Sequence, residues 1–149
     1  MGECSYFLKA KFASHEKALV AAESLGKTLA EVGEAYAFWQ ANRGKKNREE
    51  FWAEFEGKFP LAIEVLKLTR DVEVGGDCHN GLAGKLSYCD QNASEVEVDG
   101  NEVKYSALVW HMADWDGLAD WIKSALKAKA VTWASEEMID PFDGLDYAE

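Results

Sequence analysis

The chain has 149 residues, a formal net charge of −11 at pH 7 and a hydrophobic content of 48%. These values predict one folded domain, residues 1–149, with a sizeable core, and the negative charge disfavours direct binding to nucleic acid because phosphates would be repelled. There is no charged-then-apolar leader and no apolar run approaching about 18 residues, so we expect a cytoplasmic protein that does not enter a membrane.

The amino-terminal segment predicts a strand followed by a long helix. Segment 6–12 predicts a strand with one buried face, because Tyr6, Leu8, Ala10 and Phe12 alternate with Phe7, Lys9 and Lys11. Ser14 is suited to cap the next helix, and Gly44 to end it. The apolar positions of this helix recur at helical spacing and form one continuous stripe: Leu25, Leu29, Val32, Tyr36 and Trp39.

Residues 45–93 predict a helical and loop insertion. Asn47 is a good cap for a short helix, and Pro60 suits the first turn of another. Residues 75–92 read as a loop punctuated by glycine. The aromatic residues of the first inserted helix are Phe51, Trp52 and Phe55.

The inserted loop contains the one cluster of thiol and imidazole groups, Cys78, His79 and Cys89. Three cysteines are an odd number, which disfavours a disulfide framework and fits a reducing compartment. A metal site would lack the second close ligand pair of a zinc knuckle, and a nucleophilic Cys78 would depend on His79 to favour its ionisation. The sequence favours loop residues without a special role, so we expect no metal and no other cofactor.

A hairpin is predicted next. Val96 and Val98 alternate with acidic residues, and Asp99-Gly100 favours a turn that needs a positive φ. The alternation then continues through residues 103–110, which predicts the second strand of the hairpin.

A helix and a closing strand complete the pattern. Asp114 and Asp116 are suited to cap the helix, and residues 130–133 have the β-branched and aromatic content of a strand. The apolar helix positions are Trp115, Leu118, Trp121, Ile122, Ala125 and Leu126. Taken together, the elements predict an α+β fold with a ferredoxin-like split βαβ core. In this core a four-stranded antiparallel sheet has two helices on one face, and the helical insertion lies between the first helix and the central hairpin.

The sheet face opposite the two helices is the predicted binding surface. If the apolar side of each strand faces the helices, Phe7 and Trp110 emerge on the open face, with Leu108 nearby. Aromatic platforms of this kind stack bases in RNA-binding modules, but the basic stripe that such modules need is missing. Two alternatives remain: the inserted helices fold back over this face and bury it, or the face binds a protein partner or a second copy of the chain.

An enzymatic alternative depends on the junction between the hairpin and the following helix. His111 with Asp114 and Asp116 has the groups needed for acid-base chemistry. The two aspartates are already explained as helix caps, and the phosphate-binding and nucleophile motifs of known enzyme classes are absent from the sequence. The sequence therefore favours a binding role over catalysis.

The negative charge is concentrated in the second half of the chain. Residues 1–75 contain 11 basic and 12 acidic residues, whereas residues 76–149 contain 5 and 15. The acidic segment at residues 136–149 is interpreted either as a solvated tail or as a docking segment for a basic partner. A further alternative is that the protein imitates the charge of nucleic acid and inhibits a basic protein. The leading prediction is a non-catalytic module that binds a protein partner through the open sheet face, the acidic carboxyl-terminal surface or both.

Overall fold

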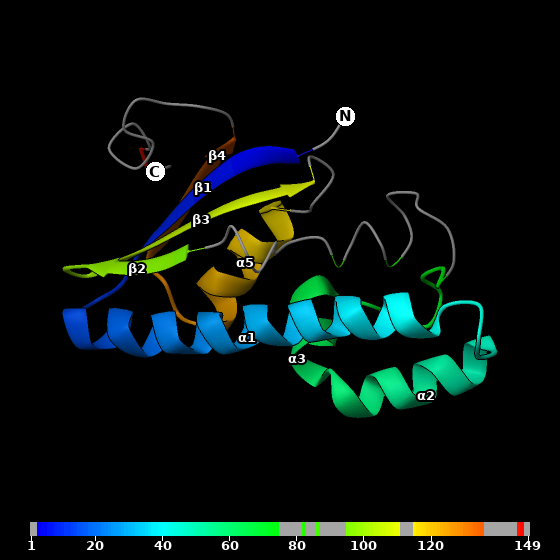
Figure 1. Cartoon of the computed structure of the whole chain (residues 1–149). Helices are drawn as coiled ribbons and strands as arrows, with labels where there is room; N and C mark the ends of the chain where they lie inside the picture. The colour runs from blue at the N-terminus through cyan, green and yellow to red at the C-terminus, as the bar shows by residue number, and fades with distance from the viewer. Residues whose placement is uncertain are drawn as a thin grey trace.

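The computed structural model describes residues 3–74, 82, 86, 95–110, 115–135 and 146–147. These residues form an α+β fold in which helices lie against one face of a four-stranded antiparallel sheet (Figure 1). The α+β class and the four-stranded antiparallel sheet predicted from the sequence are therefore confirmed.

The sheet has the strand order β2-β3-β1-β4. Its strands are β1 (Glu3–Lys11), β2 (Glu95–Asp99), β3 (Glu102–Trp110) and β4 (Ala130–Ser135). β1 pairs with β3 along its whole length, from Glu3 opposite Trp110 to Lys11 opposite Glu102. The first and third strands are thus the central neighbours, and β2 and β4 are the edges.

The turn between β2 and β3 has the backbone conformation that the sequence predicted. Gly100 adopts a φ of +62°, which an L side chain rarely tolerates. The backbone N–H of Phe12 donates to the carbonyl of Asn101 at 2.8 Å, and the Asn101 amide donates back to the Phe12 carbonyl at 3.0 Å. These two hydrogen bonds tie the hairpin to the end of β1.

The long helix α1 (His15–Asn42) begins and ends as predicted. The Ser14 hydroxyl accepts a hydrogen bond from the backbone N–H of Lys17 at 3.2 Å, which satisfies an amide that the helix leaves without a partner. After the helix, Gly44 adopts a φ of +77°. Four of the five stripe residues are buried, namely Leu25, Leu29, Val32 and Trp39, and Tyr36 is partly buried.

In the part of the chain that the structure describes, three shorter helices follow: α2 (Arg48–Lys58), α3 (Pro60–Leu66) and α5 (Trp115–Ala125). The Asn47 side chain caps α2 by accepting from the backbone N–H of Glu50 at 2.9 Å. Pro60 occupies the first turn of α3, where its missing N–H is tolerated. The capping role of Asn47 and the position of Pro60 agree with the sequence patterns.

The helices form a layer on one side of the sheet. α1 packs against β2 and β3, and α5 packs against β4 and β1. α3 contacts both α1 and α5, and α2 lies beside α1 on the side away from the sheet (Figure 1). The alternative in which the inserted helices cover the open face is therefore wrong, because α2 and α3 extend the helical layer instead.

An aromatic cluster joins α2 to α1. Phe51, Trp52 and Phe55 from α2 are all at most 2% exposed. Phe55 lies 5.4 Å from Trp52 and 5.1 Å from Phe59 between ring centroids. Phe38 of α1 completes the cluster, with its ring centroid 5.4 Å from that of Phe51. The apolar face of α2 is thus buried against α1 and against the α2–α3 junction.

Glu31 of α1 caps α3 from outside that helix. Its carboxylate accepts a hydrogen bond from the backbone N–H of Ala62 at 2.8 Å, and no side chain at the start of α3 performs this role. We expect Glu31→Ala to lower the free energy of unfolding by about 1 kcal/mol, the usual effect of removing a cap. Urea denaturation would measure this, with Glu34→Ala on the same helix as the matched control. Equal losses in the two variants would contradict the capping role.

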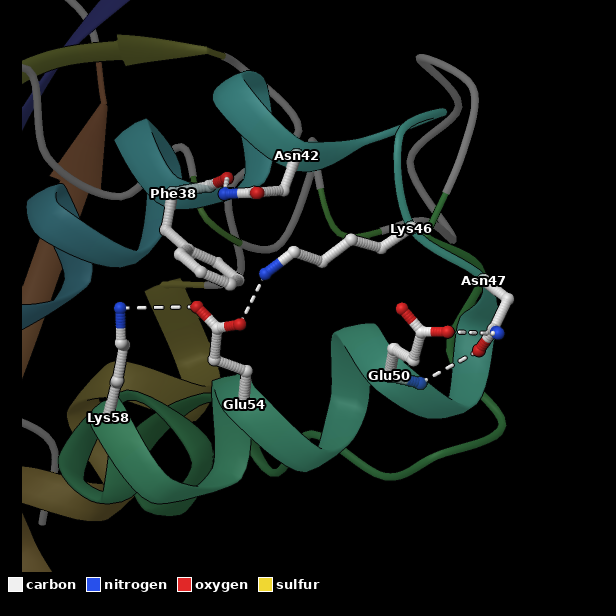
Figure 2. Close-up of polar contacts among 7 residues, drawn as sticks. All are labelled: Phe38, Asn42, Lys46, Asn47, Glu50, Glu54 and Lys58. Carbon is white, nitrogen blue, oxygen red and sulfur yellow. Dashed lines mark hydrogen bonds and ion pairs between the residues drawn. The ribbon is translucent and has the colours of Figure 1, made fainter.

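A small ionic cluster joins the second half of α2 to the connection between α1 and α2 (Figure 2). Glu54 forms ion pairs with Lys46, and with Lys58 at 3.2 Å. The two ammonium groups also lie 5.5 Å and 5.2 Å from the centroid of the Phe38 ring. Hydrogen bonds from Lys46 and then Lys58 lower the pKa of the Glu54 carboxyl from its ordinary value of 4.5. The connection between α1 and α2 is thus held by charge as well as by apolar burial.

The lowered pKa of Glu54 predicts an acid-dependent contribution to stability. The carboxylate stabilises the fold above its ordinary pKa, and this contribution is lost as the pH falls through the lowered value. We expect Glu54→Gln to reduce the free energy of unfolding at neutral pH, and we expect this effect to shrink as the pH falls through the lowered pKa of the wild-type carboxyl. Denaturation at neutral pH and at a series of acidic pH values would test this, with the exposed Glu64→Gln as the control. A difference that persists unchanged in acid would contradict it.

Candidate interaction surface on the open face of the sheet

The open face is the side of the sheet that faces away from α1 and α5. On β1 the side chains of Leu8 and Ala10 are buried beneath the helices, at 0% and 1% exposed. Because side chains alternate along a strand, Phe7, Lys9 and Lys11 lie on the opposite side. Phe7 and Lys9 are partly buried there, and Lys11 is exposed.

The neighbouring strands add polar and small side chains to this face. On β3, Val103 and Tyr105 are buried at 2% and 0%, so the intervening positions face outward. The strand register then aligns the residues across the sheet. The contributing residues are Glu102, Lys104 and Ser106 from β3, Thr132 and Ala134 from β4, and Glu95, Glu97 and Asp99 from β2.

Basic groups occupy the centre of the open face and acidic groups occupy its β2 edge. Lys9 lies directly opposite Lys104 in the pairing of β1 with β3. Lys104 forms an ion pair with Asp99 at 3.0 Å, and its side chain is only 16% exposed. Two lysines therefore lie side by side at the centre of this surface, although Asp99 pairs with one of them and the chain as a whole is strongly negative.

Tyr147, from the carboxyl-terminal end of the chain, lies on this face. Its hydroxyl donates a hydrogen bond to a carboxylate oxygen of Glu102 at 2.5 Å, and the Lys9 ammonium is 4.8 Å from its ring centroid. Figure 1 shows this segment on the side of the sheet opposite α1 and α5. Burial of the hydroxyl, followed by its hydrogen bond to Glu102 and the charge of Glu102, raises the pKa of Tyr147 above its ordinary value of 10.0.

The predicted binding residues are separated along the strands. Phe7 lies on the open face, where its backbone pairs with Ser106. Trp110 pairs with Glu3, four positions from Phe7, which corresponds to about 13 Å along a strand. The side chains of Leu108 and Trp110 lie outside the part that the structure describes. The backbone register thus argues against a compact platform made of Phe7 and Trp110 alone.

Of the three residues predicted for acid-base chemistry, the structure describes only Asp116. Its carboxylate accepts a hydrogen bond from the indole N–H of Trp133 at 3.0 Å, and the residue is exposed in the first turn of α5. This contact links the helix to β4 and gives Asp116 a structural explanation. His111 and Asp114 lie outside the described residues.

The candidate metal ligands Cys78, His79 and Cys89 also lie outside the described residues. Elsewhere, in the segments that the structure does describe, no three histidine, cysteine or acidic side chains gather in a way that suits a metal ion. Similarly, none of the described helices combines the length and the apolar character needed to cross a membrane.

Sequence reasoning missed the contact between Tyr147 and the sheet. The signal in the sequence was a tyrosine among acidic residues near the carboxyl terminus, a pattern that fits a solvated tail equally well. No protein-family model, curated protein or solved structure matches this chain. The arguments about function therefore depend on its own residues.

Proposed function

We propose that this chain is a cytoplasmic, non-catalytic interaction module that binds a protein partner through the open face of its sheet. The strand order and the one-sided helical layer support a ferredoxin-like core within a single domain, residues 1–149. On this proposal residues 45–93 are the helical insertion, and residues 136–149 form an acidic segment from which Tyr147 contacts the open face. The core thus supplies a rigid sheet with one face available to a partner.

One observation carries the proposal: the open face already holds an aromatic side chain that comes from outside the sheet. Tyr147 reaches both Lys9 and Glu102, so its ring meets a cation and its hydroxyl meets a carboxylate. A partner's tyrosine would find the same groups. Aromatic residues are enriched where protein surfaces meet, because they combine apolar area with a polar group.

The test compares an open-face variant with a variant on the opposite side of the molecule. We expect Phe7→Glu to abolish the capture of partner proteins from a cell extract, because a carboxylate would enter the apolar part of the surface. Leu19→Glu introduces the same group on α1, where Leu19 is 48% exposed, and should leave capture unchanged. Circular dichroism would establish that both variants fold, and light scattering after size-exclusion chromatography would reveal self-association.

Mass spectrometry would identify the proteins captured by the wild type and by each of the two variants. Loss of the same proteins in both variants, or in neither, would refute the open-face proposal. Lys9→Ala tests the same surface independently in the capture experiment. It removes the central cation while leaving Phe7 in place, and it should also reduce the capture of partner proteins.

A second candidate function is supported by the acidic edge strand. Glu95, Glu97 and Asp99 are exposed along β2 and point to one side of the sheet, at a spacing of about 6.6 Å. A regular row of carboxylates is what a mimic of nucleic-acid charge would need. Association that disappears between about 0.1 M and about 1 M salt, and that is lost in a Glu95→Gln, Glu97→Gln double variant, would favour this function. Association that persists in high salt would favour the open face.

A further inference from the structure

A groove lies between the first turns of α1 and the end of α5, on the helical side of the molecule. Its space is open to solvent on one side and has a volume of about 630 Å³. Its apolar lining includes Phe12, Val20, Ala21 and Leu126, and Ser24 adds a hydroxyl. This volume is within the range of sites that bind small molecules, which span about 300–1,000 Å³.

The packing of the two helices explains why this groove is present. α1 packs over β2 and β3, whereas α5 packs over β4 and β1. α5 ends at Ala125, and the chain then reverses its direction at Lys127, which has a φ of +64°. Val20 on the α1 wall is 69% exposed. The groove is therefore a concave surface whose apolar side chains, such as Val20, are exposed to water.

Three lysines surround this apolar lining. Lys17 projects from the first turns of α1, and Lys127 and Lys129 follow α5. Glu16 is the one acidic residue of the lining, and among the described residues none of the three ammonium groups forms an ion pair with a carboxylate. The backbone of Lys129 is fixed by a 2.7 Å hydrogen bond from its N–H to the carbonyl of Lys11. The groove thus carries local positive charge on a chain of net charge −11.

We propose that this groove binds one small amphiphilic anion, a molecule with an apolar body and a single carboxylate or similar acidic head. The body would cover Val20 and Leu126, and the head would meet Lys17, Lys127 and Lys129. A concave site of this volume suits a single molecule rather than the surface of a bilayer. This inference is independent of the open face, because the groove lies on the helical side of the sheet.

Isothermal titration calorimetry with decanoate at a concentration below micelle formation tests the proposal on the full chain. Decanoate is expected to bind. Butyrate has the same head with a shorter body, and decyltrimethylammonium has the same body with a cationic head, so both should bind at least about tenfold more weakly. Vesicles of phosphatidylglycerol would separate a free anion from a lipid surface.

Two pairs of variants locate the site. Val20→Glu and Lys127→Glu should each weaken decanoate binding by about tenfold or more. Leu19→Glu and Lys123→Glu place the same charges on α1 and α5 but outside the groove lining, and they should bind decanoate as the wild type does. The proposal is overturned if groove and control variants lose affinity equally, if decyltrimethylammonium binds as tightly as decanoate, or if only vesicles bind. Because all four positions are exposed, the variants are expected to fold.

Discussion

Phe55→Ala is expected to lower the free energy of unfolding by about 3–5 kcal/mol. The Phe55 side chain is 0% exposed, and its ring contacts those of Phe38, Phe51, Trp52 and Phe59. Truncation removes apolar area from the core and leaves a cavity that the four surrounding rings cannot all collapse to fill. Since these rings come from α1, α2 and the α2–α3 junction, the loss should affect the attachment of both inserted helices.

Urea denaturation followed by tryptophan fluorescence would measure this effect, because Trp52 lies within the cluster. Leu61→Ala is the matched control: Leu61 is an apolar residue of α3 that is 36% exposed, so its truncation should change stability by no more than about 0.5 kcal/mol. A loss below about 1 kcal/mol for Phe55→Ala would mean that the cluster repacks around the gap, and the inserted helices would then depend on other contacts.

The local elements could be predicted from the sequence because each has a short repeat. Alternation along β1 correctly placed Leu8 and Ala10 beneath the helices and Lys9 on the other side. The dipeptide Asp99-Gly100 predicted its turn because only a glycine adopts the required positive φ without strain. A pattern that repeats every two or every three to four residues is visible within ten residues, so strands and helices follow from it directly.

The position of the inserted helices could not be predicted in the same way. The aromatic content of α2 indicates that one of its faces is buried, but it does not identify the surface that covers it. Phe38, which receives that face, lies outside the stripe that marks the core side of α1. The hydrogen bond from Ala62 to Glu31 joins residues 31 positions apart, and no local repeat encodes such a pair. Long-range packing therefore settled a choice that the sequence left open.

On the candidate surface, too, features set by neighbouring residues could be predicted from the sequence, whereas features set by distant residues could not. The orientation of Phe7 follows from alternation, and the separation of Phe7 from Trp110 follows from the register of two strands that are distant in sequence. The contact between Tyr147 and Glu102 spans 45 residues and had no counterpart in the sequence patterns. It is also the feature that most directly affects how a partner could reach the open face.

Removal of the Tyr147 side chain is expected to expose Lys9 and to strengthen partner binding. An exposed contact between a cation and an aromatic ring contributes about 0.5–1 kcal/mol, and a hydrogen bond to a charged group about 1.5–3 kcal/mol. Ordering the end of the chain offsets part of this gain. If about 1 kcal/mol remains, Tyr147→Ala should raise both the rate of Lys9 acetylation and the affinity for a partner on this face by about fivefold.

Quantitative acetylation with mass spectrometry measures the first effect without knowledge of the partner. Lys123, exposed on α5, is the internal control, and its rate should be the same in wild type and variant. Tyr147→Phe separates the two contacts, because it keeps a ring over Lys9 and removes only the hydroxyl that donates to Glu102. An unchanged Lys9 rate in Tyr147→Ala would show that Tyr147 does not restrict access to the open face.

The pH dependence of the free energy of unfolding provides a second test of the contact between Tyr147 and Glu102. Because burial and Glu102 raise the pKa of Tyr147 in the folded chain, the protonated hydroxyl stabilises the fold below its ordinary pKa of 10.0. This contribution is lost as the pH rises above that value, when the unfolded chain releases the proton first. The stability difference between wild type and Tyr147→Phe should therefore be constant near neutrality and shrink in alkali.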